Sequence, residues 1–387
     1  MDMILSNASL DARNILVIVN SLSELDSAWL IFRENPDYVF CAVIPGEFCF
    51  QDFCNSRLSE LPNLILNCSQ NDVLYKIRNT GLVLAVGCGA SGILPDFLRL
   101  ISFCSELHIP VAELQCSILR LGASDFTKPE SYAETKTLKT DHDFINAGGF
   151  ADYLLSYYPA TAERCNGTVI GFTKYHQKEL NCSFCNAGYV LVLADFSVGC
   201  FTAEDTDAFL GCIIKTAASY PDIQFLIRPD DSGIEFYFNK TISFNACENI
   251  TIVQFDPLLG LIPFDSLIAD SAKVVSTLSS SLLECEALGK DTIVYKCKSC
   301  SGLLDEIDEC RTFSNADELR PFVEGREHCA VRTGKLIEFD NSVFRDFVER
   351  TFSVPDLPKQ QVLKQIVRYS ALLDSDRWKI EISGIGD

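Results

Sequence analysis

The sequence predicts an α/β protein made of two Rossmann-like, doubly wound domains that face a cleft. With 387 residues, the chain is longer than one hydrophobic core usually supports. Short apolar runs alternate with helix-like segments from residue 14 onward, and a second series of such runs begins near residue 189. We therefore expect a first domain over residues 1–165, a second over residues 166–345, and C-terminal helices over residues 346–387.

In the first domain, short buried strands alternate with helices. A helix is expected over residues 23–33. Residues 123–175 are polar and irregular, so we expect them to supply loops and the connection between the domains. The expected strands are residues 14–20, 38–44, 63–67, 82–86 and 109–114.

A glycine-rich turn follows the strand expected at residues 82–86. Gly87, Gly89 and Gly92 have the G-x-G-x-x-G spacing of a dinucleotide-binding loop, and a helix is expected to follow. However, the turn does not belong to the first strand–helix unit, and no acidic residue clearly ends a following strand at the right distance. The sequence therefore favours a position of this turn beside the cleft over a role in binding NAD or FAD.

The second domain repeats the alternation. A strand is expected over residues 189–194, ending at Asp195, and a helix capped by Thr202 is expected to run to about residue 219. Strands are expected over residues 223–228 and 251–255. The two amphipathic stretches near the C-terminus, residues 342–351 and 358–373, are expected to be helices.

The most informative stretch is residues 264–295. It predicts a helix, a strand over residues 273–277, a serine turn, a second helix that ends at Gly289, and a strand over residues 292–295. The serine turn is Ser279, Ser280 and Ser281. Free N–H groups and the dipole at a helix N-terminus attract anions, and serine hydroxyls add donors, so this turn is a candidate phosphate site. Capping of the helix alone is the simpler alternative.

Three polar positions follow expected strands of the second domain. Asp195, Arg228 and Ser279 each stand at or just past the carboxyl end of a strand. Ligands of open parallel sheets bind beyond those ends, so we expect the three side chains to face one cleft. Glu284, one turn into the helix after the serines, is placed to accept hydrogen bonds from a ribose diol.

Composition narrows the classes of partner. The formal charge is −21, with 53 acidic and 32 basic residues, which argues against a nucleic-acid partner. No apolar run approaches the roughly 18 residues of a membrane span. The apolar run at residues 15–19 is too short for a signal peptide and follows Asp11 and Arg13. We expect a cytoplasmic protein.

The chain has 18 cysteines. Many of them, such as Cys41, Cys88, Cys104 and Cys212, lie within apolar segments, where a free thiol behaves as a small buried hydrophobe, so we expect them to be reduced. Two pairs have the spacing of zinc ligands, which leaves a four-cysteine site as a minor alternative to the expectation of no metal. These pairs are Cys182 with Cys185 and Cys297 with Cys300.

The serine turn is part of the pattern Ser-Ser-Ser-x-x-Glu-x-x-x-x-Gly-Lys over residues 279–290. This pattern resembles the serine motif of GT-B glycosyltransferases, notably bacterial capsule and lipopolysaccharide enzymes that use cytidine-activated donors. Those families usually carry an upstream Arg/Lys-Pro-His-Pro element. Arg228 and Pro229 match it, but Asp230 and Asp231 stand in place of His-Pro. An acidic pair repels a phosphate that a histidine would contact.

A second resemblance lies in IPVAELQCSILRLG, residues 109–122. It is similar to a loop in the N-terminal domains of retaining β-Kdo transferases. Glu113, Gln115 and Gly122 occupy matching places, whereas Cys116 and Ser117 stand where His-Gly is expected. Two histidine positions are therefore altered, which implies either divergent chemistry or reduced activity.

The resemblance implies a metal-independent glycosyltransferase without a cofactor, with CMP-Kdo as the most plausible donor and a role in surface polysaccharide or lipopolysaccharide synthesis. Asp195 would be the nucleophile. Apart from the resemblance, Asp143 lies with Asp141 and His142 in the densest titratable cluster of residues 123–175, which can supply a general base, with a solvated loop as the simpler alternative. The acceptor would be a glycan or a lipid-linked glycan, with peripheral membrane association left open, and the C-terminal helices would cross back to the first domain. The implied donor-binding residues are Arg228, Asp230, Ser279, Ser280, Ser281 and Glu284, and the implied acceptor or cleft residues are Gly87, Gly89, Glu113, Gln115 and Cys116.

Two alternatives keep the fold and change the activity. The serine turn also resembles the Ser-Ser-Ser-x-x-Asp pattern of CDP-glycerol glycerophosphotransferases of teichoic-acid synthesis, although residues 113–122 favour the Kdo side. A catalytically silent GT-B-like binding protein is the other alternative. The altered positions Cys116, Asp230 and Asp231 motivate it.

Overall fold

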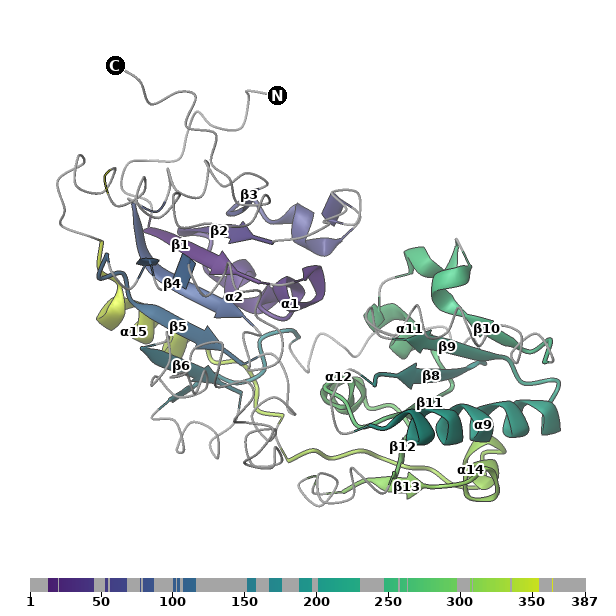
Figure 1. Ribbon diagram of the computed structural model, residues 1–387. Coiled ribbons are helices and arrows are strands. Elements are labelled where there is room, and N and C mark those ends of the chain that lie inside the picture. Colours follow the sequence, from purple (N-terminus) through teal and green to yellow (C-terminus); the bar gives the residue numbers. More distant parts are fainter. Residues whose placement is uncertain are drawn as a thin grey trace. The chain divides into compact units, whose positions relative to one another are not determined.

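The chain folds into two compact units, each built around its own parallel sheet (Figure 1). Unit 1 comprises Met1–Cys116, Ala123–His176 and Ile337–Asp387, and unit 2 comprises Ser117–Gly122 and Gln177–Leu336. The structure is a computed structural model. It describes residues 13–19, 21–44, 53–54, 56–67, 77, 79–86, 100–101, 103–104, 107–115, 152–157, 167–175, 188–196, 201–229, 247–256, 258–262, 264–297, 307, 309–334, 336–354 and 364.

Unit 1 contains a seven-stranded, fully parallel sheet in the order β3-β2-β1-β4-β5-β6-β7. Its first six strands follow the order 3-2-1-4-5-6 of a Rossmann sheet. The connections after β1 and β4 lead in opposite directions, so the topological switch point lies between these two strands. The strands are β1 (Arg13–Ile18), β2 (Tyr38–Val43), β3 (Leu64–Asn67), β4 (Thr80–Val86), β5 (Val111–Leu114), β6 (Tyr153–Ser156) and β7 (Thr168–Val169).

Two features of unit 1 differ from the prediction. Residues 123–175 were expected to supply only loops, but β6 and β7 lie within them. These strands are too short to give a periodic signal, and they are stabilised by pairing, β6 with β5 and β7 with β6. The helix expected over residues 23–33 is two helices, α1 (Leu22–Asp26) and α2 (Trp29–Glu34). They are separated because the Leu30 N–H donates to the Thr173 carbonyl (2.8 Å) instead of the preceding turn.

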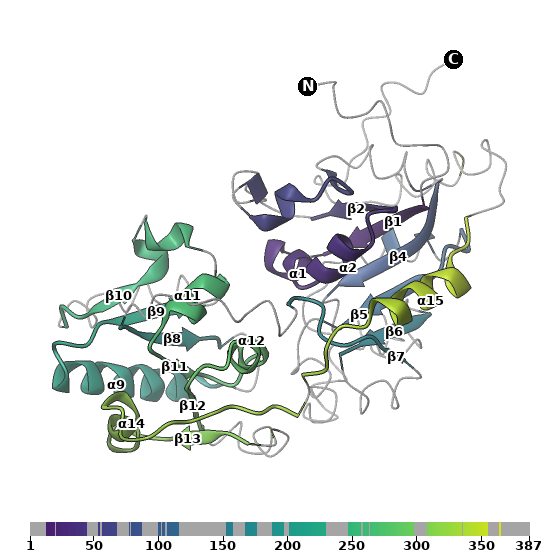
Figure 2. The same cartoon turned by 180° about the vertical axis from the view of Figure 1, so that it is seen from behind.

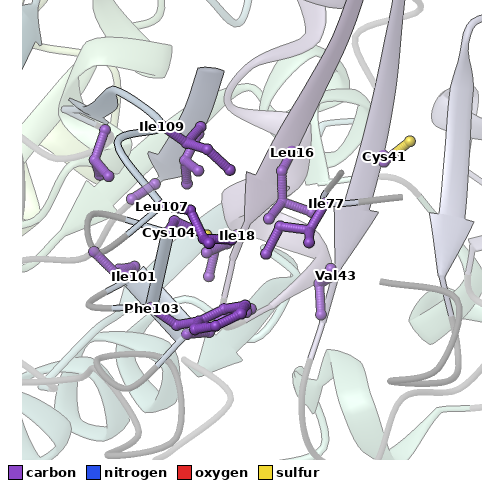
Figure 3. Close-up of a cluster of buried hydrophobic side chains, with 14 residues drawn as sticks. Leu16, Ile18, Cys41, Val43, Ile77, Ile101, Phe103, Cys104, Leu107 and Ile109 are labelled. Atoms are coloured by element: carbon purple, nitrogen blue, oxygen red, sulfur yellow. The ribbon is translucent and has the colours of Figure 1, made fainter. Parts of the chain in front are cut away.

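One face of this sheet carries a buried apolar cluster, drawn in Figure 3. Leu16 and Ile18 of β1 contribute to it alongside Val83 of β4 and Val111 of β5. Full burial of each such side chain contributes about 1.5–3 kcal/mol. The complete set is Leu16, Ile18, Cys41, Val43, Ile77, Val83, Ala85, Leu100, Ile101, Phe103, Cys104, Leu107, Ile109 and Val111.

The chain returns to unit 1 after completing unit 2. Helix α15 (Asn341–Thr351) begins after Asp340, whose carboxylate accepts from the N–H of Ser342 (2.9 Å). It packs against α2 and β7 (Figure 2), with Phe344, Phe347 and Val348 buried. The helix was expected over residues 342–351. The second expected C-terminal helix, over residues 358–373, lies outside the described residues apart from residue 364.

Unit 2 contains a six-stranded, fully parallel sheet in the order β10-β9-β8-β11-β12-β13. Counted within the unit, this is again the Rossmann order 3-2-1-4-5-6, with the switch point between β8 and β11. The last strand, β13, was not expected from the sequence. The strands are β8 (Val190–Ala194), β9 (Phe225–Pro229), β10 (Ile250–Ile252), β11 (Lys273–Ser276), β12 (Thr292–Tyr295) and β13 (Arg311–Phe313).

The helices of unit 2 cover both faces of this sheet. The predicted long helix is α9 (Ala203–Ser219), with Thr202 and Asp205 forming a capping box. Its Phe209 packs against Tyr295 and Phe313, and α9 contacts α14 (Ala316–Val323), which the sequence did not predict. The opposite face is covered by α11 (Phe264–Asp270), whose Leu267 and Ile268 are buried against the strands. Helix α12 (Ser281–Ala287) follows β11.

Asparagines stabilise equivalent places in the two units. In unit 1, the Nδ2 amide of Asn63, just before β3, donates to the carbonyls of Phe32 and Asn35 at the end of α2 (2.9 Å each). In unit 2, the Nδ2 amide of Asn249, just before β10, donates to the Ala217 and Tyr220 carbonyls at the end of α9 (3.0 and 2.9 Å). Each asparagine therefore supplies additional donors to the carbonyls at the end of a helix, most of which also accept a backbone N–H.

Within the described part of the chain, no helix combines the length and the apolar character that a membrane span requires.

Candidate functional site

The switch point of unit 2 brings together polar residues that are far apart in the sequence. Asp195 follows β8, and Thr277 and the serine turn follow β11, the strand beside it. The connection after β8 leads to β9, whereas the connection after β11 leads to β12, so the chain diverges here. Such a point is where open α/β sheets bind ligands. We call Asp195, Thr277, Ser279, Ser280 and Ser281 the β8–β11 corner.

Asp195 is held in this corner through its backbone. Its N–H donates to the Oγ1 of Thr277 (3.1 Å), and the Thr277 hydroxyl donates to the carbonyl of Asp195 (2.7 Å). Thr277 is completely buried, while Asp195 is half-buried. Both backbone groups of the aspartate are therefore anchored to the neighbouring strand end.

The three serines of the turn differ in their surroundings. Ser279 is completely buried, and its Oγ accepts a hydrogen bond from the N–H of Ser281 (3.2 Å), the first residue of α12, whose N-cap position is Ser280. Ser280 and Ser281 are half-buried, and neither hydroxyl bonds to any residue that the structure describes. These two hydroxyls can donate to a bound anion, in addition to the backbone of the turn.

Arg228 lies on β9, on the other side of β8 from the serine turn. It is paired in register with Leu193, two residues before Asp195. Its guanidinium lies 5.1 Å from the ring centroid of Phe264, the first residue of α11. This stacking supports a half-buried cation near the carboxyl edge of the sheet. Arg228, Asp195 and Ser279 thus belong to three consecutive strands, β9, β8 and β11.

Helix α12 is fixed at both ends. Glu284, the candidate ribose ligand, is buried in its first turn. Glu286 accepts hydrogen bonds from both the N–H (2.8 Å) and the hydroxyl of Thr333.

The residues after α12 contact α11. After Gly289, which has φ of 60°, the Lys290 ammonium donates to the carbonyls of Ala269 and Ser271. The Gly-Lys end of the serine pattern therefore stabilises the end of α11, and burial lowers the pKa of Lys290.

In unit 1, two of the candidate acceptor-side residues are described. Glu113 is a buried residue of β5. Gln115 follows β5, and its Oε1 accepts from the Ser156 hydroxyl (2.8 Å) and the Tyr157 N–H (3.0 Å). These bonds tie the ends of β5 and β6 together, which is a structural role for the side-chain oxygen.

Several candidates fall where the structure gives no description. Gly87 and Gly89 come just after β4, so their loop begins at the switch point of unit 1, but the loop itself lies outside the described residues. The same holds for Cys116, Asp143 and Asp230. Of the four cysteines with zinc-like spacing only Cys297 is described, and it is buried. The described residues contain no cluster of histidine, cysteine or carboxylate groups that would suit a metal.

Thr277 was not singled out by the sequence, which placed it as the last residue of a strand. The available signal was its position, since it is a hydroxyl residue directly between a buried strand and the serine turn. Threonine is common within strands, so this position alone does not distinguish a packing residue from a linking one.

No protein-family model and no curated protein matches the sequence. Solved structures do match. The UDP-GlcNAc 2-epimerase of Methanocaldococcus jannaschii, in complex with UDP-GlcNAc and UDP, is 12% identical, with 92% of this chain and 99% of that one covered, at a TM-score of 0.51. Anabaena HepE, in complex with UDP and glucose, is 13% identical over 93% and 99% of the chains, at a TM-score of 0.49. The Escherichia coli heptosyltransferase WaaC is 11% identical over 81% and 100%, at 0.38.

At these identities the likeness concerns the fold, and the epimerase match carries it over almost the whole length of both chains. It agrees with the two Rossmann sheets, each with its own switch point, described above. The chain therefore has the two-domain, Rossmann-like fold of the GT-B type that its sequence predicted.

Proposed function

We propose that this chain is an enzyme that acts on a nucleotide-activated sugar, and that the phosphates of the nucleotide bind at the β8–β11 corner. The observation that carries the proposal is the meeting of Asp195 and the serine turn at the switch point of unit 2. Two hydroxyls there, of Ser280 and Ser281, make no bond within the described structure. Arg228 adds a cation on the adjacent strand of an otherwise acidic chain.

The reaction that we propose is glycosyl transfer, with CMP-Kdo as donor and a cell-surface glycan as acceptor. Ser280, Ser281 and Arg228 would stabilise the negative charge that develops on the leaving phosphate. Hydrogen-bond donors and cations lower a reaction barrier most where charge develops in the transition state. Asp195 would attack the anomeric carbon, and an acceptor hydroxyl would then displace it. Glu284 would accept hydrogen bonds from the ribose. Asp143 would act as the general base, and Asp230 would contact the nucleotide-sugar.

Acceptor binding is proposed for unit 1. The loop of Gly87 and Gly89 follows β4 at the switch point of that sheet, where ligands of such sheets bind. Glu113 and Cys116 flank the end of β5 in sequence and would contact the acceptor. Gln115 would act indirectly, by holding the ends of β5 and β6 together.

A second candidate activity is epimerisation of a UDP-sugar. One solved structure with a TM-score above 0.5 is a UDP-GlcNAc 2-epimerase in complex with UDP-GlcNAc and UDP, and it is covered over 99% of its length. Both activities use a nucleotide-sugar that carries phosphate, a monophosphate in CMP-Kdo and a diphosphate in a UDP-sugar, so the same corner serves either. The nature of the base and the second substrate would decide between them. Transfer from a CDP-glycerol donor also remains, as does binding without turnover.

The proposal is tested first by nucleotide binding. A thermal-shift titration with CMP, CDP, UDP and NAD should show stabilisation by a pyrimidine nucleotide, because a ligand that binds only the folded state raises its stability by about 2.7 kcal/mol at 100 times Kd. Replacing both Ser280 and Ser281 by alanine should weaken that binding roughly 10-fold, at about 1 kcal/mol or less per lost hydrogen bond. Ser219→Ala, on the exposed part of α9, is the matched control and should bind normally.

Product analysis then distinguishes the two activities. A glycosyltransferase should release CMP when it is incubated with CMP-Kdo and a glycan acceptor. An epimerase should instead convert UDP-GlcNAc into its 2-epimer, which proton NMR detects. Asp195→Ala should bind the nucleotide and lose turnover. A chelator should not change either rate, since the corner stabilises phosphate with donors of the chain itself. If none of the nucleotides stabilises the wild-type protein, the proposal is wrong.

A further inference from the structure

We infer that Thr277 is a positioning residue, which holds Asp195 in place at the carboxyl edge of the unit 2 sheet through its side-chain hydroxyl. The expected effect of Thr277 on turnover rests on the proposed function. Its role in holding Asp195 rests only on the hydrogen bonds between the two residues. The two hydrogen bonds described between Thr277 and Asp195 both reach the backbone of the aspartate, so we expect the effect of Thr277 on a reaction to pass through Asp195.

The pairing of β8 with β11 ends at this residue. The last backbone bond between the two strand ends runs from the Thr277 N–H to the Leu193 carbonyl (3.0 Å). In a continued parallel ladder, the next bond would run from the Asp195 N–H to the Thr277 carbonyl. Instead, the Asp195 N–H donates to the Oγ1 of Thr277. The side chain has therefore replaced the backbone carbonyl as acceptor.

The carbonyl that is released finds another partner. The hydroxyl of Ser276 donates to the Thr277 carbonyl at 2.7 Å, and both Ser276 and Thr277 are completely buried. Two adjacent hydroxyls thus satisfy the groups left by one missing ladder bond, as buried polar groups require. Because the carbonyl no longer faces β8, β11 can end there and the chain can turn into Ser279–Ser281.

The Thr277 hydroxyl also donates to the Asp195 carbonyl, at 2.7 Å. One hydroxyl can donate one hydrogen bond and accept two, so this side chain binds both backbone groups of the same residue at once. That pair of bonds limits rotation of the Asp195 backbone on both sides of its Cα. The direction of the carboxylate therefore depends on Thr277, in the way that preorganised sites depend on the groups that support them.

The experiment compares three variants. Thr277→Val keeps the shape of the side chain and removes the hydroxyl, whereas Thr277→Ser keeps the hydroxyl. Thr292→Val is the matched control, because Thr292 is equally buried, lies in the same sheet and donates a single bond to the Lys290 carbonyl (2.9 Å) at the amino end of β12. Aspartate-selective isotope labelling, with Asp195→Asn to assign the signal, reports on Asp195 directly.

In Thr277→Val we expect amide hydrogen exchange at Asp195 to accelerate at least 10-fold and the carboxyl carbon signal of Asp195 to shift. Thr277→Ser should retain both wild-type values, and Thr292→Val should retain both while losing comparable thermal stability. If the Asp195 signals of Thr277→Val are unchanged, the inference is overturned whatever the protein binds. If Thr277→Val does not fold, unchanged Asp195 signals in Thr277→Ala would overturn it equally.

The kinetic arm separates this inference from the proposed function. With the donor that the wild-type protein turns over, Thr277→Val should lower kcat at least 10-fold while the Kd for CMP or UDP stays within about 2-fold. A purely structural role would lower kcat no more than Thr292→Val does. Wild-type protein without binding or turnover would refute the proposed function, while the exchange measurement would still decide whether Thr277 positions Asp195.

Discussion

Gly171 and Glu338 lie in direct backbone contact within unit 1. A Cβ atom on residue 171 would stand 2.2 Å from the carbonyl oxygen of Glu338, and the backbone of Gly171 has φ of 81°. The flanking residues pair as well: the Phe172 N–H donates to the Ile337 carbonyl (2.7 Å), and the Asp340 N–H donates to the Ile170 carbonyl (2.9 Å). The segment that returns from unit 2 is thus tied to the segment that leaves for it.

Gly171→Ala should be strongly destabilising. The substitution adds a methyl group where backbone atoms already stand and forces an L-residue into the left-handed region. We expect a loss of more than about 2 kcal/mol, measured by urea denaturation. Gly188→Ala is the matched control, since Gly188 has φ of 76° but no atom of the described residues within 4 Å of the added carbon. It should lose only about 1 kcal/mol, and equal losses in the two variants would contradict the close approach.

Phe352→Ala should weaken the attachment of the segment after α15. The Phe352 ring lies against Gly81 of β4, the Arg13 guanidinium lies 5.6 Å from its centroid, and the Ser353 N–H donates to the Gly81 carbonyl (2.9 Å). Truncation of a buried aromatic costs about 3–5 kcal/mol, and less for this half-buried ring. Val354→Ala, at a side chain that is 47% exposed, should change the urea midpoint little.

Asn249→Asp should be more destabilising than Asn249→Ala. The amide of Asn249 donates to three carbonyls, those of Ala217, Tyr220 and Ile223, at 2.9–3.0 Å. Alanine removes these donors at a cost of about 1–3 kcal/mol, although the carbonyls of Ala217 and Tyr220 keep backbone bonds, whereas a buried carboxylate would also repel the carbonyl oxygens. Gln224→Ala, which removes an exposed bond to Thr251, is the control for the loss of an amide. The reverse ranking in thermal denaturation would show that the amide donors are not what the site requires.

The ion pair of Asp37 and Arg345 should stabilise unit 1 in a pH-dependent way. The Arg345 guanidinium donates two hydrogen bonds to the carboxylate (2.9 and 2.6 Å) and so holds the pKa of Asp37 below its usual value of 3.8. A lowered folded-state pKa means that the contribution is complete above the unfolded pKa and is lost as the pH falls through the folded one. Since both side chains are well exposed, we expect about 0.2–1 kcal/mol at pH 7.

The measurement compares Asp37→Asn with the wild type from pH 7 down to pH 3. The difference in free energy of unfolding should shrink only below about pH 4, and added salt should reduce it at pH 7. Asp346→Asn, on the exposed face of α15, is the control, because its carboxylate forms no ion pair with a described residue. A difference that grows toward acid pH would contradict the assigned direction.

The cysteines should react with iodoacetamide in order of their exposure. Cys54 is exposed, whereas Cys104 and Cys285 are completely buried. Burial raises the pKa of Cys285 to about 12 and raises the pKa of Cys104 as well, so neither forms much thiolate near pH 8. By peptide mass spectrometry, Cys54 should be alkylated at least about 100-fold faster than either. Early labelling of Cys285 in the folded protein would contradict the burial of α12.

Much of each sheet could be predicted from the sequence. The strands over residues 292–295 and 38–44, and the helix capped by Thr202, match β12, β2 and α9 almost residue for residue. These elements have strong local signals, either a run of buried apolar residues or a cap followed by acidic residues. Of the cysteines expected to be buried, Cys41, Cys104 and Cys212 are buried and free.

The elements that the sequence missed depend on distant partners. Strand β6 forms because β5 offers an edge, and β7 forms because β6 then offers the next one. The break between α1 and α2 exists because the Leu30 N–H bonds to the Thr173 carbonyl. The candidate site shows the same division. Local pattern alone placed Asp195, Arg228 and Ser279 at the ends of strands, because strand ends are marked by the loss of apolar character.

Which of those ends are neighbours was decided by the tertiary structure. The order β9-β8-β11 places Asp195 between Arg228 and the serine turn, and the bonds from Thr277 to Asp195 join residues 82 positions apart. A sequence reports such a pairing only through the side chains that make it, and a threonine at a strand end has the same local pattern whether or not it holds a neighbour. Composition and periodicity therefore determined most of the strands and helices of the two units, while the long-range hydrogen bonds within unit 2 determined how Asp195, after β8, is held by Thr277, after β11.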